Sequence, residues 1–128
     1  MYTLDTNAII YYLDRDPAVV VTLDRLLENV DAVFYVSAVT ELELYSYPDL
    51  NDEEEAGITR LLTDTFVVPL DARIARYAGY LRRLYRLKTP DSAIAATAIL
   101  TKTTLLTRNV DDFRAIAHLK WQAISMTL

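Results

Sequence analysis

Apolar residues follow two alternating patterns along this chain. Short runs rich in β-branched and aromatic residues predict buried strands. Between them, apolar residues recur every three or four positions, which is typical of helices with one buried face. The expected strands cover residues 2–5, 32–36, 65–70 and 103–107, with a weaker strand at 122–125. Such an order of strands and helices predicts an α/β fold.

Polar residues next to these segments predict where the helices begin. Four residues are of types that favour the N-cap position: Asp16, which a proline follows, Ser37, Asp71 and Thr89. The acidic run 52–55 suits the first turn of another helix, where the helix dipole favours negative charge. A short helix is expected at residues 6–13, and longer helices at 17 to about 30, 72 to about 87, and 90–100.

Strands and helices alternate through the whole chain, so we expect crossover connections and a largely parallel sheet. The predicted architecture is a three-layer sandwich of four to five strands with helices on both faces. With 128 residues and no linker or repeat, residues 1–128 form a single expected domain. Ligands of such sheets bind beyond the carboxyl ends of the strands. Polar residues at those ends are therefore the candidates for function.

The composition excludes several kinds of active site. The chain has no cysteine, and His118 is its one histidine, so a ribonuclease site built from two histidines is impossible. Both glycines, Gly57 and Gly79, fall within helical patterns, which excludes a glycine loop that cradles phosphate. Neither a membrane-spanning run nor a secretory signal is visible. We therefore expect a cytoplasmic protein with no membrane partner.

The formal net charge is −5, but the charges are polarised along the sequence. Six basic residues lie between positions 73 and 88, together with three tyrosines. Arginines combined with aromatic residues suit single-stranded RNA, because they bind phosphates and stack on bases. Pairing of each arginine with a nearby acid is an equally good interpretation. The candidate substrate contacts are Arg82, Arg83 and Arg86.

Several oxygen-bearing side chains occupy positions at or just after expected strand ends. Each has an ordinary interpretation as a helix cap or a solvated surface group. Glu41 and Glu43 are two helical steps apart, which is a rotation of about 200°, so only one of them can face a shared pocket. We expect Glu41 to do so. The converging set is then Asp5, Glu41, Asp91, Asn109 and Asp112.

Carboxylates gathered at one place need a cation. Two of them about 4 Å apart repel by about 4 kcal/mol at an effective dielectric constant near 20. A site of oxygen ligands without cysteine or histidine selects Mg²⁺ or Mn²⁺. These ions activate water for attack on a phosphodiester. The residues therefore predict a hydrolase with Mg²⁺ (or Mn²⁺) as cofactor.

Four motifs contain these residues. In chain order they are Leu4-Asp5-Thr6-Asn7, Val39-Thr40-Glu41-Leu42-Glu43, Thr89-Pro90-Asp91-Ser92-Ala93-Ile94-Ala95-Ala96-Thr97-Ala98 and Leu106-Thr107-Arg108-Asn109-Val110-Asp111-Asp112-Phe113. Their order and spacing resemble those of PIN-domain ribonucleases, particularly VapC-like toxins of toxin-antitoxin pairs. The similarity covers nearly the whole chain and suits a stand-alone toxin.

The resemblance implies an endoribonuclease that cleaves single-stranded or loop RNA. Asp5, Glu41 and Asp91 would match the three core acidic ligands. Asn109 stands where many members have an aspartate, and Asp112 is the next acid. We expect these five residues to bind the metal, and all except Asn109 to be catalytic. The hydroxyls of Thr6 and Thr107 are expected substrate contacts.

The resemblance also implies protein partners. A cognate antitoxin would cover an apolar groove near the early helices and block the acidic pocket, and the toxin would form a homodimer. Tyr11, Tyr12 and Leu13 are candidate contacts, although burial in the core explains them equally well.

Two alternatives stay open. Because Asn109 adds no charge, the chain could be a weakly active or inactive PIN-like module that binds RNA or protein. It could also be an RNA-processing nuclease without an antitoxin. A phospho-acceptor signalling domain fits less well, because Asp5 has no acidic neighbour and Arg108 stands where a lysine is wanted.

Overall fold

The computed structural model describes residues 1–124. Within them, strands and helices alternate as the apolar pattern predicts. In chain order they are β1 (Tyr2–Leu4), α1 (Thr6–Leu13), α2 (Pro17–Leu27), β2 (Phe34–Ser37), α3 (Ala38–Leu44), α4 (Asp52–Thr63), β3 (Phe66–Val68), α5 (Ala72–Tyr85), α6 (Thr89–Thr101), β4 (Thr104–Thr107), α7 (Val110–Phe113) and β5 (Trp121–Ala123).

The five strands form one sheet in the order β3-β2-β1-β4-β5, and every neighbouring pair is parallel. The chain moves outward from β1 through β2 to β3, then returns to the other side of β1 as β4. The strand order therefore reverses between β1 and β4. In open α/β sheets this reversal is where a crevice for ligands forms at the carboxyl ends. The predicted α/β sandwich is confirmed.

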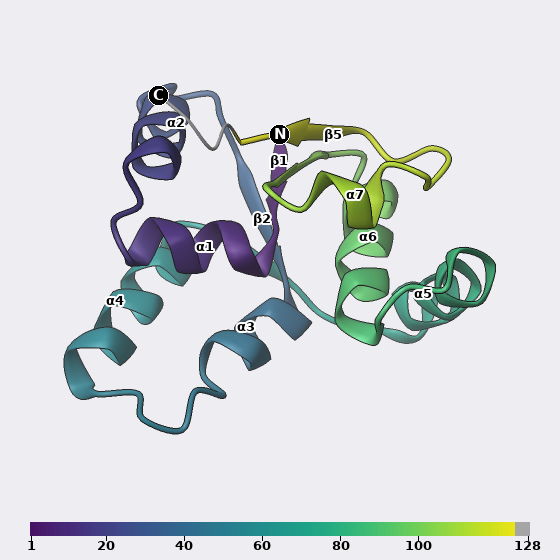
Figure 1. Ribbon diagram of the computed structural model, residues 1–128, viewed down its shortest axis with the longest axis horizontal. Helices are drawn as coiled ribbons and strands as arrows, with labels where there is room; N and C mark the ends of the chain where they lie inside the picture. The colour runs from purple at the N-terminus through teal and green to yellow at the C-terminus, as the bar shows by residue number, and fades with distance from the viewer. Residues whose placement is uncertain (125–128) are drawn as a thin grey trace.

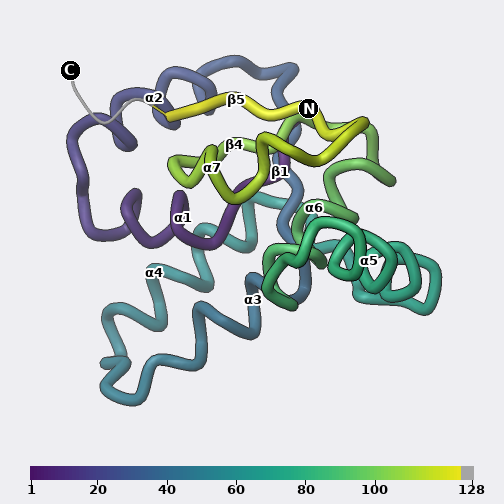
Figure 2. Tube along the Cα trace, turned by 45° about the vertical axis from the view of Figure 1, so that its right-hand side comes forward, coloured from purple at the N-terminus to yellow at the C-terminus, as the bar shows by residue number. Residues whose placement is uncertain are grey.

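Helices cover both faces of the sheet and create two separate cores. One core joins β1, β2 and β4 to α1, α2 and α4, and the other joins β4 to α5 and α6 (Figures 1 and 2). Leu106 points into the first core and the adjacent Leu105 into the second, as the alternation of side chains along a strand requires. Seven consecutive residues of α6, 92–98, are buried, because this helix lies between the sheet and α5.

Helix starts agree closely with the predicted caps. Asp16, Ser37 and Asp71 each occupy the N-cap and accept a backbone N–H from the first turn. Thr89 was expected to cap α6, but it is the first helical residue, and Lys88 occupies the N-cap without a side-chain bond. This difference moves Asp91 to the third position of the helix, still within its first turn.

Element ends differ from prediction by a few residues. Helix α2 stops at Leu27 rather than near residue 30, and β5 begins one residue earlier than expected, at Trp121. Ser125, which we placed in the last strand, lies outside the described residues. Within residues 1–124, no helix has both the length and the apolar character needed to cross a membrane.

Candidate active site

A cavity of about 330 Å³ opens beyond the carboxyl end of β1. The reversal in strand order begins at this same strand, because β1 lies between β2 and β4. Three of its lining side chains are carboxylates, and they come from three different elements of the fold. The lining residues are Asp5, Thr6, Asn7, Ile10, Glu43, Ser46, Tyr47, Pro48 and Asp91.

Asp5 is at the base of this cavity, directly after β1. It occupies the N-cap position of α1 in an extended conformation, but its side chain makes no capping hydrogen bond. Instead, Oδ2 accepts a hydrogen bond of 2.8 Å from the Oγ1 hydroxyl of Thr107, at the end of β4. The residue is only 2% exposed. Asp5 is therefore a buried carboxylate held toward the cavity by the neighbouring strand.

The pKa of Asp5 is raised from 3.8 to about 6, mainly because the carboxyl is buried and also because the charges of Asp91 and Glu43 lie nearby. The Thr107 hydroxyl acts in the opposite sense, because its hydrogen bond stabilises the ionised carboxylate. Burial also raises the pKa of Asp91, followed by the charges of Asp112 and Glu43, while Lys88 lowers it. These shared effects show that the three carboxylates of the cavity lie close enough to repel one another.

Glu43, not Glu41, faces the cavity. Thr6 Oγ1 donates a hydrogen bond of 2.7 Å to Glu43 Oε1 and lies 2.9 Å from Thr40 Oγ1. These bonds tie α3 to the start of α1 beside Asp5. Glu41 is absent from the cavity lining, so our expectation that it joins Asp5 and Asp91 is wrong.

Helix geometry explains why the sequence pattern could not separate the two glutamates. The buried side of α3 is marked by Thr40 and Leu44. At about 100° per residue, Glu41 and Glu43 each lie about 80° from the middle of that side, in opposite directions. Which direction leads to Asp5 depends on where α1 packs, and this is a property of the tertiary structure.

Thr107 acts inside the protein rather than on a substrate. Its side chain is fully buried, its hydroxyl donates to Asp5, and the same oxygen accepts a bond of 2.9 Å from the backbone N–H of Asn109. The Thr107 side chain has no exposed surface left, so our expectation that it contacts the substrate is wrong. Thr6, the other predicted substrate contact, does line the cavity.

Asn109 and Asp112 lie outside the cavity lining. Asn109 occupies the N-cap position of α7, and its side chain makes no capping bond. Asp112 is exposed, and it is near enough to Asp91 for its charge to raise the pKa of that carboxyl. Asp112 therefore belongs to the rim of the acidic region, while Asn109 fixes the orientation of Thr107 through its backbone.

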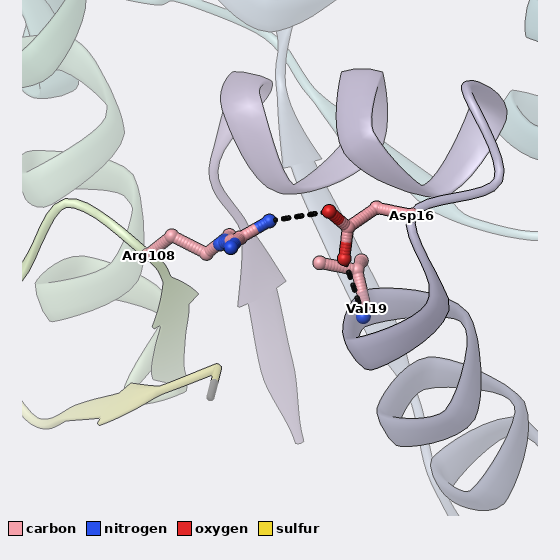
Figure 3. A network of polar contacts seen from close by, with 3 residues as sticks. All are labelled: Asp16, Val19 and Arg108. Atoms are coloured by element: carbon pink, nitrogen blue, oxygen red, sulfur yellow. Dashed lines mark hydrogen bonds and ion pairs between the residues drawn. The ribbon is translucent and has the colours of Figure 1, made fainter. Parts of the chain in front are cut away.

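An ion pair holds the turn between β4 and α7 to the corner between α1 and α2. Arg108 Nη1 lies 2.9 Å from Asp16 Oδ2, and the Asp16 carboxylate also accepts the N–H of Val19 at the start of α2 (Figure 3). The Arg108 side chain is 4% exposed, and its guanidinium lies 4.4 Å from the centre of the Tyr11 ring. Hydrogen bonding from Arg108 lowers the pKa of Asp16. The residue after Thr107 is thus anchored to both α1 and α2.

The predicted basic contacts lie on another part of the surface. Arg82 and Arg83 are exposed in the last turn of α5, and Arg86 is its left-handed C-cap, with φ of 56°. None of them lines the cavity. They precede α6 and Asp91 in the chain, so they remain candidates for binding RNA beyond the cavity. Lys88 is the cation whose charge reaches Asp91.

The donors in the cavity suit a hard divalent ion. Its carboxylates offer only oxygen ligands, and neither cysteine nor histidine is present there. Among the described residues, no three acidic, histidine or cysteine side chains are close enough together to hold an ion as they stand. Mg²⁺ commonly uses only one or two carboxylates and keeps several waters. The residues of the cavity therefore fit Mg²⁺ or Mn²⁺ in that mode.

Together, the parallel sheet and the acidic cavity at the end of β1 define the class of protein: an α/β sandwich with a candidate ligand site at the carboxyl ends of its strands. Comparison with known proteins identifies the family. The chain belongs to the PIN domain family, which it matches over residues 2–119.

The similar proteins extend over almost the whole chain. Ribonuclease VapC1 of Haemophilus influenzae (strain R2866) is 30% identical, covering 95% of this chain and 96% of the relative. A toxin-antitoxin complex from Klebsiella pneumoniae has a TM-score of 0.74 at 25% identity, over 99% of this chain and 98% of the other. The fold also matches VapBC2 from Rickettsia felis bound to a promoter DNA fragment, with a TM-score of 0.81, 22% identity and coverage of 97% and 98%.

Proposed function

We propose that this protein is a metal-dependent endoribonuclease that hydrolyses phosphodiester bonds of single-stranded or loop RNA. The observation that carries the proposal is the convergence of Asp5, Glu43 and Asp91 on one cavity. The relative from Haemophilus influenzae is named a ribonuclease, which supports RNA as the substrate.

In the proposed site one or two of the carboxylates of Asp5, Glu43 and Asp91 would bind Mg²⁺ or Mn²⁺, with Asn109 and Asp112 at its periphery. Such an ion would supply an activated water and neutralise charge on the phosphodiester. The Thr107 hydrogen bond favours the ionised form of the Asp5 carboxyl and holds it toward the cavity, and Thr6 orients Glu43. Burial of Asp5 strengthens the interaction of its charge with any ligand in the cavity, because little water screens it.

Conservative substitutions test this assignment. We expect Asp5→Asn and Asp91→Asn each to lower metal-dependent cleavage of single-stranded RNA by at least about 100-fold, because each removes a charge from the ligand set. Calorimetric titration with Mn²⁺ should show weakened binding by both variants. Unchanged cleavage in either variant would show the proposed site to be wrong.

Glu43 and Glu41 provide a matched pair within one helix. Glu43→Gln should reduce cleavage by about 10- to 100-fold, because it removes a carboxylate from the cavity. Glu41→Gln makes the same chemical change outside the cavity lining and should leave kcat unchanged. Equal losses in the two variants would contradict the assignment of Glu43.

We further propose that the protein is the toxin of a toxin-antitoxin pair and forms a homodimer. The toxin-antitoxin complex among the similar structures supports a protein partner. A mainly apolar groove of about 380 Å³ offers that partner a surface between β1, β2, α1, α2 and α4. Its lining residues are Leu4, Tyr12, Leu13, Arg15, Leu23, Leu27, Phe34, Gly57, Arg60, Leu61, Asp64 and Thr65.

A further inference from the structure

One aromatic side chain borders the acidic cavity without a structural role of its own. Tyr47 lines the cavity with Asp5 and Asp91, yet it is 51% exposed. Among residues 1–124, none forms a hydrogen bond with the Tyr47 hydroxyl, and no aromatic ring stacks on the Tyr47 ring. Burial and polar pairing therefore do not account for a tyrosine here.

The backbone at Tyr47 is held in place although its side chain is not. Tyr47 begins a turn in which its carbonyl accepts a bond of 3.3 Å from Leu50 N–H, and Pro48 fixes the second position of that turn. Two residues earlier, at the end of α3, Tyr45 Oη lies 2.7 Å from Thr59 Oγ1, and this hydrogen bond ties α3 to α4. The ring of Tyr47 is thus carried by an anchored loop at a defined edge of the cavity.

We propose that Tyr47 stacks on a nucleobase next to the phosphodiester that is cleaved, and so favours RNA whose base at that position is unpaired. This inference rests on the proposed ribonuclease function. A scissile phosphate at the carboxylates places its flanking bases at the edge of the cavity, since bases project away from the backbone that enters it. An exposed ring on a fixed loop gives such a base a flat apolar surface at little entropic cost, and stacking tolerates any base.

Stacking makes a specific kinetic prediction. Tyr47→Ala should raise the KM for RNA by about 10-fold, which is within the range of base stacking on aromatic residues, while kcat changes less than about two-fold. Tyr47→Phe should keep the wild-type KM, because the ring remains. The control is Phe66→Ala, which removes an aromatic ring that is 62% exposed in β3 and does not line the cavity, and its KM should equal the wild-type value. Circular dichroism checks that each variant is folded.

Abasic nucleotides locate the stacked base. Cleavage of a fluorescein-labelled single-stranded RNA is mapped first, and each nucleotide flanking the cut is then replaced by an abasic ribose. In the wild-type protein one of these replacements should raise KM by about 10-fold, and in Tyr47→Ala the same replacement should add nothing. Mn²⁺ dissociation constants measured by calorimetry should agree between Tyr47→Ala and wild type.

The possible failures are distinguishable. If wild type cleaves RNA but Tyr47→Ala has the wild-type KM, or still shows the abasic penalty, the stacking inference is wrong. If Tyr47→Phe raises KM as much as Tyr47→Ala does, the hydroxyl and not the ring makes the contact. That result also overturns the stacking inference. If wild type cleaves no RNA with Mg²⁺ or Mn²⁺, the proposed function itself fails, and this inference with it.

Discussion

The buried charge of Asp5 makes the metal-free protein sensitive to pH. Its pKa is about 6 in the folded state, against an ordinary value of 3.8. The folded state therefore binds a proton more tightly than the unfolded state, and this group stabilises the fold most below the lower value. As pH rises through about 6, that stability is lost, by about 3 kcal/mol in total for a shift of this size.

Asp5→Asn should remove this pH dependence. The amide oxygen can still accept the Thr107 hydrogen bond, but no charge is buried. Urea unfolding in a chelator should show Asp5→Asn more stable than wild type above about pH 6, with the difference disappearing toward pH 4. Added Mg²⁺ should stabilise wild type and not the variant. The exposed control is Asp49→Asn. If the free energy of unfolding changed with pH in the same way for wild type, Asp5→Asn and Asp49→Asn, this account would be contradicted.

The effect of the Thr107 hydroxyl on the candidate site can also be tested by a single substitution. Thr107→Val keeps the shape of the side chain and removes both the donor to Asp5 and the acceptor for Asn109 N–H. We expect Mn²⁺ affinity and kcat each to fall by about 10- to 100-fold, as for other groups that orient a metal ligand. Thr97→Val is the matched control, because Thr97 is equally buried but bonds only within its own helix. Similar losses in both variants would indicate a packing defect instead.

A site residue was predictable from the sequence where its position next to a strand or helix end alone places it at the site. Asp5 follows a buried strand and Asp91 lies in the first turn of a helix, so both could be assigned to the strand ends before the structure was known. Glu43 could not be chosen over Glu41, because the choice depends on the packing of α1 against α3. The role of Thr107 depends on β4 lying beside β1, which the sequence does not state.

At the level of elements, the Arg108–Asp16 pair connects the turn after β4 to the corner between α1 and α2 (Figure 3). Arg108→Met should lower the thermal midpoint of unfolding and weaken Mn²⁺ binding, because the turn that carries Thr107 loses its anchor. Arg114→Met is a fitting control, since its ion pair with Asp111 is exposed and contributes little. Equal thermal midpoints for the two variants would contradict an anchoring role for Arg108.

The elements themselves were largely predictable, since their signals are local. Caps at Asp16, Ser37 and Asp71 are single residues that satisfy the first backbone N–H groups of a helix, so they act alike in most folds. The prediction for Thr89 was wrong because proline is favoured at the first helical position, which made Thr89 the expected cap, whereas Pro90 is the second residue of α6. Strand ends were less exact, because a strand extends only as far as its neighbour provides partners.

At the level of the molecule, the strand order decides where the site is. Alternating strands and helices predict a parallel sheet, but many strand orders satisfy that pattern. The observed order puts β1 and β4 side by side at the reversal, so that Thr107 meets Asp5 across a distance of 102 residues in sequence. The apolar groove is a second consequence of the whole fold, because its walls come from strands and helices on one face of the sheet.

A partner that occupies this groove should depend on Leu27, which lines it and is 48% exposed. Leu27→Glu places a charge against the apolar segment of the partner, so we expect binding to weaken by at least about 10-fold. The partner to test is the proposed antitoxin, by calorimetry with the purified pair. Val30→Glu adds the same charge nearby, at a 94% exposed residue outside the groove, and should bind normally. RNA cleavage by free Leu27→Glu should equal that of wild type, and inhibition by the partner should be lost. Undiminished binding of Leu27→Glu would show that the partner covers a different face.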